Sequence, residues 1–166
     1  MPISNYLSFT IMPAAAPPLT ATDSDTAAQL RAVIGRLARR LRPTAAGAAA
    51  GLTPTRVTVL LDVVRHGPVR LSEVAAAEGI NPTMLSRVIS ELAADGLLDR
   101  ASDERDRRAA WVRATASGRR LAERIRRERT QAVNDALAEL DPAARSAVIA
   151  ALPALEVLAG ALGAPQ

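Results

Sequence analysis

The sequence has 166 residues, enough for one domain with its own hydrophobic core but too few for two domains of the usual size. Apolar residues make up 49% of the chain and aromatic residues only 2%, so a core must be built from Leu, Val, Ile and Ala. Because Ala and Leu are strong helix formers, this composition predicts a mainly α protein. The formal net charge of +4 is compatible with binding a polyanion and does not require it.

Cysteine is absent from the sequence, and His66 is its single histidine. The first fact excludes disulfides, thiolate metal sites and thiol redox switches. The second argues against a zinc site, which usually has several nitrogen or sulfur ligands. The sequence also has no glycine-rich phosphate loop and no pair of carboxylates at a useful spacing. We therefore expect a protein that is not an enzyme and that needs no cofactor or metal.

Residues 1–22 are expected to form a disordered N-terminal tail. They contain a short apolar stretch, residues 6–12, and then a proline-rich segment, while the first basic residue is Arg31. A secretory signal would carry positive charge before its apolar run. No apolar run approaches the ~18 residues that cross a bilayer, so we expect a cytoplasmic protein without a membrane partner. Translation from Met1 and translation from Met12 both remain open.

Two helices are predicted in the first part of the chain. The first begins near residues 23–25, whose aspartates can cap it, and ends before Pro43 because the residue preceding a proline avoids the α region. Residues 44–51 are expected to be an Ala/Gly-rich connection. Thr53-Pro54 supplies a capping hydroxyl and a proline at the first helical position, which starts the second helix, and Gly67-Pro68 ends it.

A helix-turn-helix pair is predicted next. A short helix is expected to begin at the cap Ser72 and to end at Gly79. Asn81-Pro82 repeats the cap-plus-proline signal and opens a fourth helix, which runs to Asp95 and is closed by Gly96. The tight turn containing Gly79 is the connection that a helix-turn-helix unit requires.

A small hairpin and two longer helices complete the predicted fold. Residues 97–101 and 108–114 form two short β runs around a polar turn at residues 102–107. Thr115 caps a long helix, and Asp141-Pro142 begins the last one. A hairpin placed directly after a helix-turn-helix pair predicts a mainly α winged helix-turn-helix protein with a two-stranded hairpin wing.

The fourth helix carries the residues expected to read DNA. The second helix of a helix-turn-helix pair enters the major groove with its N-terminal half. At 100° per residue, an apolar face (Leu85, Val88, Ile89, Leu92) lies opposite a polar face (Thr83, Ser86, Arg87, Ser90). Arg87 can donate two hydrogen bonds to guanine O6 and N7. The candidate DNA-binding residues of this helix are Pro82, Thr83, Met84, Ser86, Arg87 and Ser90. Taken alone, the polar face favours an ordinary solvated helix; the neighbouring hairpin shifts the interpretation toward DNA binding.

The turn of the hairpin carries the second set of candidate DNA-binding residues. A narrow minor groove attracts an inserted arginine through its concentrated negative potential. Within residues 103–108, three arginines alternate with three acidic residues, and Asp103 is positioned to hold Arg105 in the inserting posture by a charge-assisted hydrogen bond. The wing candidates are Asp103, Arg105, Arg107 and Arg108. Taken alone, this turn is better explained as a neutral surface loop; its position after a helix-turn-helix favours a wing.

These motifs together resemble the signature of the MarR family. They are the stretch Gly96-Leu97-Leu98-Asp99-Arg100, the turn Asp103-x-Arg105-Asp106-x-Arg108, and Ala114-Thr115-x-x-Gly118. The resemblance extends over about residues 26–162, with Ala114 standing where the family usually has Leu. It implies a homodimeric regulator, usually a repressor, that binds a near-palindromic operator and is often released by a small ligand. It also implies that Arg105 is the wing-tip arginine and Asp103 the aspartate that steadies it.

The domain organisation follows from where unburied apolar surface remains. We expect a domain over residues 23–163, with a DNA-binding lobe at about residues 53–115. The helices at about residues 23–42 and 116–162 are expected to form a helical dimerisation lobe. The first and last helices carry apolar stripes outside the helix-turn-helix core, and a helix stripe must be buried against something. A two-fold partner is the commonest solution.

The sequence therefore predicts a sequence-specific double-stranded DNA-binding regulator, acting as a homodimer and as a ligand-responsive repressor. Eleven arginines against five acidic residues between Arg100 and Arg129 are the kind of basic patch that contacts phosphate. The alternative is a winged-helix protein–protein interaction module without sequence-specific DNA binding. The operator, the target genes and the identity of the effector stay open.

Overall fold

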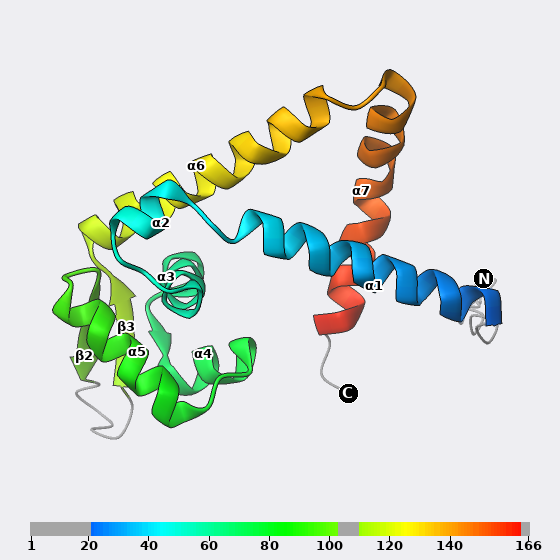
Figure 1. The fold of residues 1–166 in the computed structure, drawn as a ribbon. Helices are drawn as coiled ribbons and strands as arrows, with labels where there is room; N and C mark the ends of the chain where they lie inside the picture. Colours follow the sequence, from blue (N-terminus) through cyan, green and yellow to red (C-terminus); the bar gives the residue numbers. More distant parts are fainter. Residues whose placement is uncertain (1–20, 103–109, 164–166) are drawn as a thin grey trace, which may run out of the picture. The chain divides into compact units, whose positions relative to one another are not determined.

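The computed structural model describes residues 21–102 and 110–163, and it divides the chain into two units, residues 1–38 and 39–166. The first unit contains most of one long helix, and the second contains all the other elements (Figure 1). In chain order the elements are α1 (Ala21–Leu41), α2 (Ala45–Ala49), α3 (Pro54–His66), β1 (Val69–Arg70), α4 (Leu71–Glu78), α5 (Pro82–Ala94), β2 (Leu98–Ser102), β3 (Ala110–Ala114), α6 (Ala116–Ala138) and α7 (Pro142–Gly163). The mainly α winged helix-turn-helix fold predicted from the sequence is confirmed. The predicted disordered tail lies almost entirely outside the described residues.

Three predicted helix starts are confirmed by their caps. The Thr53 hydroxyl accepts from the Arg56 N–H at 3.4 Å, the Asn81 side chain from the Thr83 N–H at 2.9 Å, and the Thr115 hydroxyl from the Gly118 N–H at 3.0 Å. Each cap satisfies an N–H that the first helical turn leaves without a partner. These starts depend on side chains two or three residues away, which is why the sequence shows them.

Three local expectations are wrong. The first helix begins at Ala21, so the aspartates among residues 23–25 lie inside α1 and do not cap it. Residues 44–51 are not a plain connection, because they contain α2. Its first turn is held by the Thr44 hydroxyl and by Glu128 of α6, whose carboxylate accepts from the Ala46 N–H at 3.1 Å. In α4 the cap position belongs to Arg70 rather than Ser72, and Glu73 accepts from the Arg70 N–H at 3.1 Å. The chain must stay extended as far as Arg70 because Arg70 pairs with β3.

The sheet has three antiparallel strands in the order β1-β3-β2. The hairpin pairs Leu98 with Ala114 at one end and Ser102 with Ala110 at the other. The two-residue strand β1, which was not predicted, pairs Val69 with Val112. The hairpin is thereby fixed to the segment that leads into α4.

The core of the second unit lies among α3, α4, α5, the first half of α6 and the sheet. Its fully buried large side chains are Leu60, Leu85, Ile89, Leu92, Leu98, Ile125, Val59, Val63, Val74 and Val112. Aromatic residues are not needed, as the composition predicts. At the start of α6, Gly118 passes so close to the backbone just before β2 that a Cβ there would lie 2.1 Å from the Leu97 carbonyl oxygen.

Large apolar side chains are exposed on α1 and on α7. On α1 they are Val33, Ile34 and Leu37, and on α7 they include Val148, Ile149, Leu152, Leu155, Val157 and Leu162. The segment Pro142–Leu162 has a mean hydropathy of 1.6 and is long and apolar enough to span a membrane by length and composition. The expectation that no segment approaches this length is therefore wrong. This is weak evidence for a span, because a helix that packs against protein passes the same test and this one carries Arg145 and Glu156.

Candidate nucleic-acid interface

Helix α5 has one buried and one exposed face, as its periodicity predicts. Leu85, Val88, Ile89 and Leu92 are buried in the core. Pro82, Thr83, Met84, Arg87 and Ser90 are exposed, and Ser86 is half-buried. The apolar face thus fixes the rotation of the helix about its own axis. The side chains proposed from the sequence as DNA-binding residues of this helix lie on its accessible side.

The turn before α5 presents the N-terminus of the helix. Gly79 closes α4 in the left-handed conformation, with φ of 60°, which a side-chain-bearing residue rarely adopts. Two residues later Asn81 caps α5, and Pro82 occupies its first turn, where the missing N–H costs nothing. The N-terminus of a helix carries partial positive charge, which favours a nearby phosphate.

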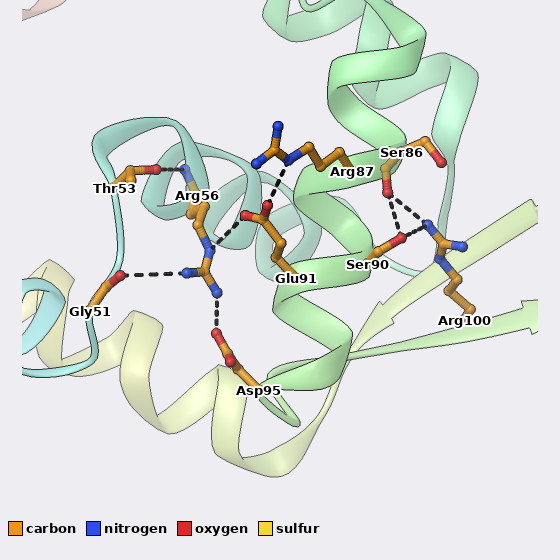
Figure 2. Close-up of polar contacts among 9 residues, drawn as sticks. All are labelled: Gly51, Thr53, Arg56, Ser86, Arg87, Ser90, Glu91, Asp95 and Arg100. Carbon is orange, nitrogen blue, oxygen red and sulfur yellow. Dashed lines mark hydrogen bonds and ion pairs between the residues drawn. The ribbon is translucent and has the colours of Figure 1, made fainter.

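Ser86 and Ser90 are joined to β2 by Arg100. The Ser90 hydroxyl donates to the Ser86 carbonyl oxygen at 2.8 Å. Arg100 Nη2 donates to the same carbonyl at 2.8 Å and to the Ser90 hydroxyl at 2.9 Å (Figure 2). The proton of Ser90 is therefore already used, so in this state its hydroxyl can offer only acceptor capacity to a DNA base. Arg100 adds a positive charge beside the exposed face of α5.

A chain of ionic contacts connects Arg87 to α3. Arg87 Nε donates to Glu91 Oε1 at 2.9 Å, and Glu91 Oε2 lies 3.8 Å from Arg56 Nε (Figure 2). Arg56 also donates to the Gly51 carbonyl oxygen at 3.5 Å and is paired with Asp95 through Nη2. The exposed fraction of the side chain rises from 14% for Arg56 to 41% for Glu91 and 83% for Arg87. Arg87, the exposed arginine of α5, is thus linked through Glu91 to Arg56, whose guanidinium is largely buried in the domain.

The wing candidates Asp103, Arg105, Arg107 and Arg108 lie outside the described residues. The strands that flank them are described, and Ser102 pairs with Ala110. Residues 103–109 therefore connect two adjacent antiparallel strands, as a hairpin wing requires. Their predicted contacts with DNA stay predictions.

Comparison with known proteins identifies the family to which a chain with this fold belongs. The model of the MarR family matches residues 52–110, from the start of α3 to the start of β3. A solved structure of a putative transcriptional regulator from Pseudomonas aeruginosa is 34% identical, has a TM-score of 0.69, and covers 85% of this chain and 98% of that one. The chain belongs to the MarR family.

Other relatives agree with this placement in the MarR family. An uncharacterized HTH-type transcriptional regulator of Mycobacterium bovis is 29% identical over 124 residues, covering 75% of this chain and 85% of that protein. A match to an uncharacterized HTH-type transcriptional regulator of Bacillus subtilis, 25% identical, covers 46% of this chain and 55% of that protein. The structure of RV1404 from Mycobacterium tuberculosis shares the fold, with a TM-score of 0.71 at 24% identity.

Sequence reasoning missed the supporting residues of this MarR-family site. The pair Arg87 and Glu91 was visible as an i, i+4 spacing of opposite charges. Arg100 was visible only as part of the family motif, without any sign that it reaches α5. Arg56 is 39 residues from Asp95 along the chain, so no local pattern could have indicated their contact.

Proposed function

We propose that this MarR-family protein is a sequence-specific, double-stranded DNA-binding transcriptional regulator whose helix α5 enters the major groove. The proposal is carried by one observation: α5 has a buried apolar face and an exposed polar face. Its apolar residues are buried, while Thr83, Met84 and Arg87 stand exposed at the N-terminal half, the half that a helix-turn-helix unit inserts. Helices hold such side chains more rigidly than loops do.

Each exposed residue of α5 has a role that follows from its chemistry. Arg87 would donate to guanine O6 and N7, a contact worth roughly 1–3 kcal/mol of discrimination. Met84, a residue that is 51% exposed, suits apolar contact with a thymine methyl group. Thr83 and Ser86 would bond a base edge or a phosphate, and Pro82 would pass close to the backbone at the helix N-terminus. Arg105, steadied by Asp103, would enter the adjacent minor groove, and Arg107 and Arg108 would contact phosphates.

A homodimer on a near-palindromic operator is the second element of the proposal. The exposed apolar side chains of α7, among them Ile149 and Leu152, are too many to stay in water on a monomer. A two-fold partner would cover them and would place two copies of α5 about one DNA turn apart, roughly 10–10.5 base pairs between half-site centres. Two-fold symmetry in the protein then selects two-fold symmetry in the operator.

Release by a small anionic effector is the third element. A cavity of about 340 Å³ lies between α3 and α6 and is lined by Thr58, Leu61, Asp62, Arg65, Arg126 and Arg129. Burial lowers the pKa of the Arg129 guanidinium, and its Nε has no hydrogen-bond partner within the described part of the chain. A carboxylate bound there would satisfy it.

A larger hollow of about 720 Å³ lies along α6 beside Arg119, Arg120, Arg124 and Arg127. These four side chains are exposed, and water already satisfies an exposed guanidinium. The smaller cavity therefore offers an anion the greater gain. We place the effector between α3 and α6, where its binding would shift α6 against the DNA-binding lobe and release a repressor from its operator in the cytoplasm.

The experiment that tests the DNA-binding proposal is selection from a library of random duplexes, followed by a salt titration of the enriched site. We expect a two-fold related sequence, and an affinity that falls with salt with a log–log slope of about −0.9 per neutralised phosphate. The alternative, a winged-helix module that binds protein, predicts no enriched sequence and only weak dependence on salt. Failure to enrich any site would reject the DNA-binding proposal.

A further inference from the structure

We propose that Glu91 is a specificity-determining positioning residue: it fixes Arg87 so that both terminal nitrogens of its guanidinium face a guanine. This inference rests on the proposed function, because it assigns the support of a residue that would read DNA. It concerns a side chain that itself touches no base.

Only one nitrogen of the Arg87 guanidinium is engaged by Glu91. Glu91 accepts from Nε, the nitrogen nearest the helix, at 2.9 Å. Neither Nη1 nor Nη2 of Arg87 has a partner among the described residues, and Figure 2 shows both lying beyond the single contact to Glu91. Nη1 and Nη2 together form the fork that matches guanine O6 and N7. The contact therefore leaves free the two donors that guanine recognition uses.

Glu91 is itself held in place by Arg56. Its other carboxylate oxygen, Oε2, faces Arg56 Nε at 3.8 Å. That nitrogen is buried and makes no hydrogen bond in the described part of the chain, so a carboxylate nearby is strongly attracted to it. Arg56 is anchored in turn by Gly51 in front of α3 and by Asp95 at the end of α5. Glu91 thus lies between one guanidinium fixed by the domain and one exposed to DNA.

Restraint of Arg87 by Glu91 changes how Arg87 binds DNA. An unrestrained arginine loses rotamer freedom when it binds a base, and restraint before binding removes much of that cost. The carboxylate also repels phosphate, so Arg87 is steered away from the DNA backbone, which carries no sequence information. Both effects favour a guanine at one position over any other sequence. Without Glu91, Arg87 would bind phosphates of any duplex.

The test compares the full-length protein with variants on two duplexes, the site that the unmodified protein enriches and the same bases in scrambled order. Glu91→Ala is expected to lower the ratio of the two affinities about three- to tenfold, since one exposed ion pair is lost in each of two subunits. Glu91→Gln is expected to retain most of the ratio, because its amide oxygen still accepts from Arg87 Nε. In an Arg87→Ala background, Glu91→Ala should change the ratio no further.

Asp99→Ala is the matched control. Asp99 is a half-exposed carboxylate on β2 whose ion-pair partner is Arg113 on β3, at 3.4 Å, rather than a residue of α5, so its removal changes the charge of the same lobe. It should shift both affinities by one factor and leave the ratio unchanged. The inference is overturned if Glu91→Ala leaves the ratio unchanged, if Asp99→Ala lowers it equally, or if Glu91→Ala still acts without Arg87. If the unmodified protein enriches no site, the proposed function fails and this inference fails with it. If it enriches a site and Glu91→Ala leaves the ratio unchanged, only the inference fails.

Discussion

At the scale of single residues, the exposed face of α5, which we propose faces DNA, is supported by charged side chains that are less exposed than Arg87. Arg56 is the centre of this support, since it contacts Glu91, Asp95 and the Gly51 carbonyl oxygen while its own side chain is only 14% exposed. Glu91 and Asp95 are four residues apart on one helix, where like charges repel. Arg56 pairs with both carboxylates, and Arg87 gives Glu91 a second positive partner, so two acids can lie close together on an element that would approach a polyanion.

Arg56→Gln is therefore expected to destabilise the protein by about 1–2 kcal/mol, because two carboxylates lose their shared partner and remain only partly solvated. Urea denaturation followed by circular dichroism measures this change. Arg65→Gln, at the exposed C-terminal end of the same helix, is the matched control and should alter the free energy of unfolding much less. Equal effects from the two variants would contradict the role given to Arg56.

Whether a contact in the site could be predicted depends on how far apart its two residues lie in the sequence. The orientation of Thr83, Ser86 and Arg87 follows from 3.6-residue periodicity, because the apolar face decides which side is buried. The engagement of Ser90 by Arg100, and of Glu91 by Arg56, depends on tertiary placement of β2 and α3. No pattern within α5 carries that information.

At the scale of elements, the helix starts that carry a local side-chain cap were predictable, whereas the start of α4 and the small tertiary elements were not. A cap such as Thr53 or Asn81 acts on its own next turn. By contrast, α2 depends on Glu128, which is 82 residues away, and β1 exists because Val69 and Arg70 pair with β3. A five-residue helix and a two-residue strand have too few residues to show a period.

The junction between β2 and α6 gives a prediction at this scale. Gly118→Ala would place a Cβ 2.1 Å from the Leu97 carbonyl oxygen, and backbone cannot move aside as a flexible side chain can. We expect a loss of about 1–3 kcal/mol in the free energy of unfolding. The neighbouring Ser117→Ala, at an exposed position of the same helix, should be close to neutral. Thermal denaturation of both variants checks the prediction, and an equally stable Gly118→Ala protein would refute the close approach.

At the scale of the whole molecule, the exposed apolar side of α7 is expected to be the dimer interface. Leu152→Glu should produce a monomer, because a charge would have to be buried between two subunits. Ala150→Glu, on the opposite face of the same helix, should remain dimeric. Analytical ultracentrifugation without detergent distinguishes the two states. A dimeric Leu152→Glu protein would place the interface elsewhere.

Removal of residues 141–166 tests the same claim more drastically. The shortened chain keeps every buried residue of the core, so it should fold as a monomer, and it should lose most of its operator affinity because two half-sites are no longer bound together. Sedimentation and a gel-shift titration measure both properties. A shortened protein that stays dimeric would show that α7 is dispensable for assembly.

We propose that α5 reads bases in the major groove, whereas the hairpin contacts DNA according to the shape of the duplex and not to individual bases. It is tested most directly by measuring the affinities of the unmodified protein, Arg87→Ala and Arg105→Ala for every single-base substitution of the enriched site. We expect Arg87→Ala to remove the preference at one base pair in each half-site, roughly 1–3 kcal/mol there, and Arg105→Ala to weaken binding to all the duplexes of similar shape. Unchanged base preferences in Arg87→Ala, at every position, would contradict it.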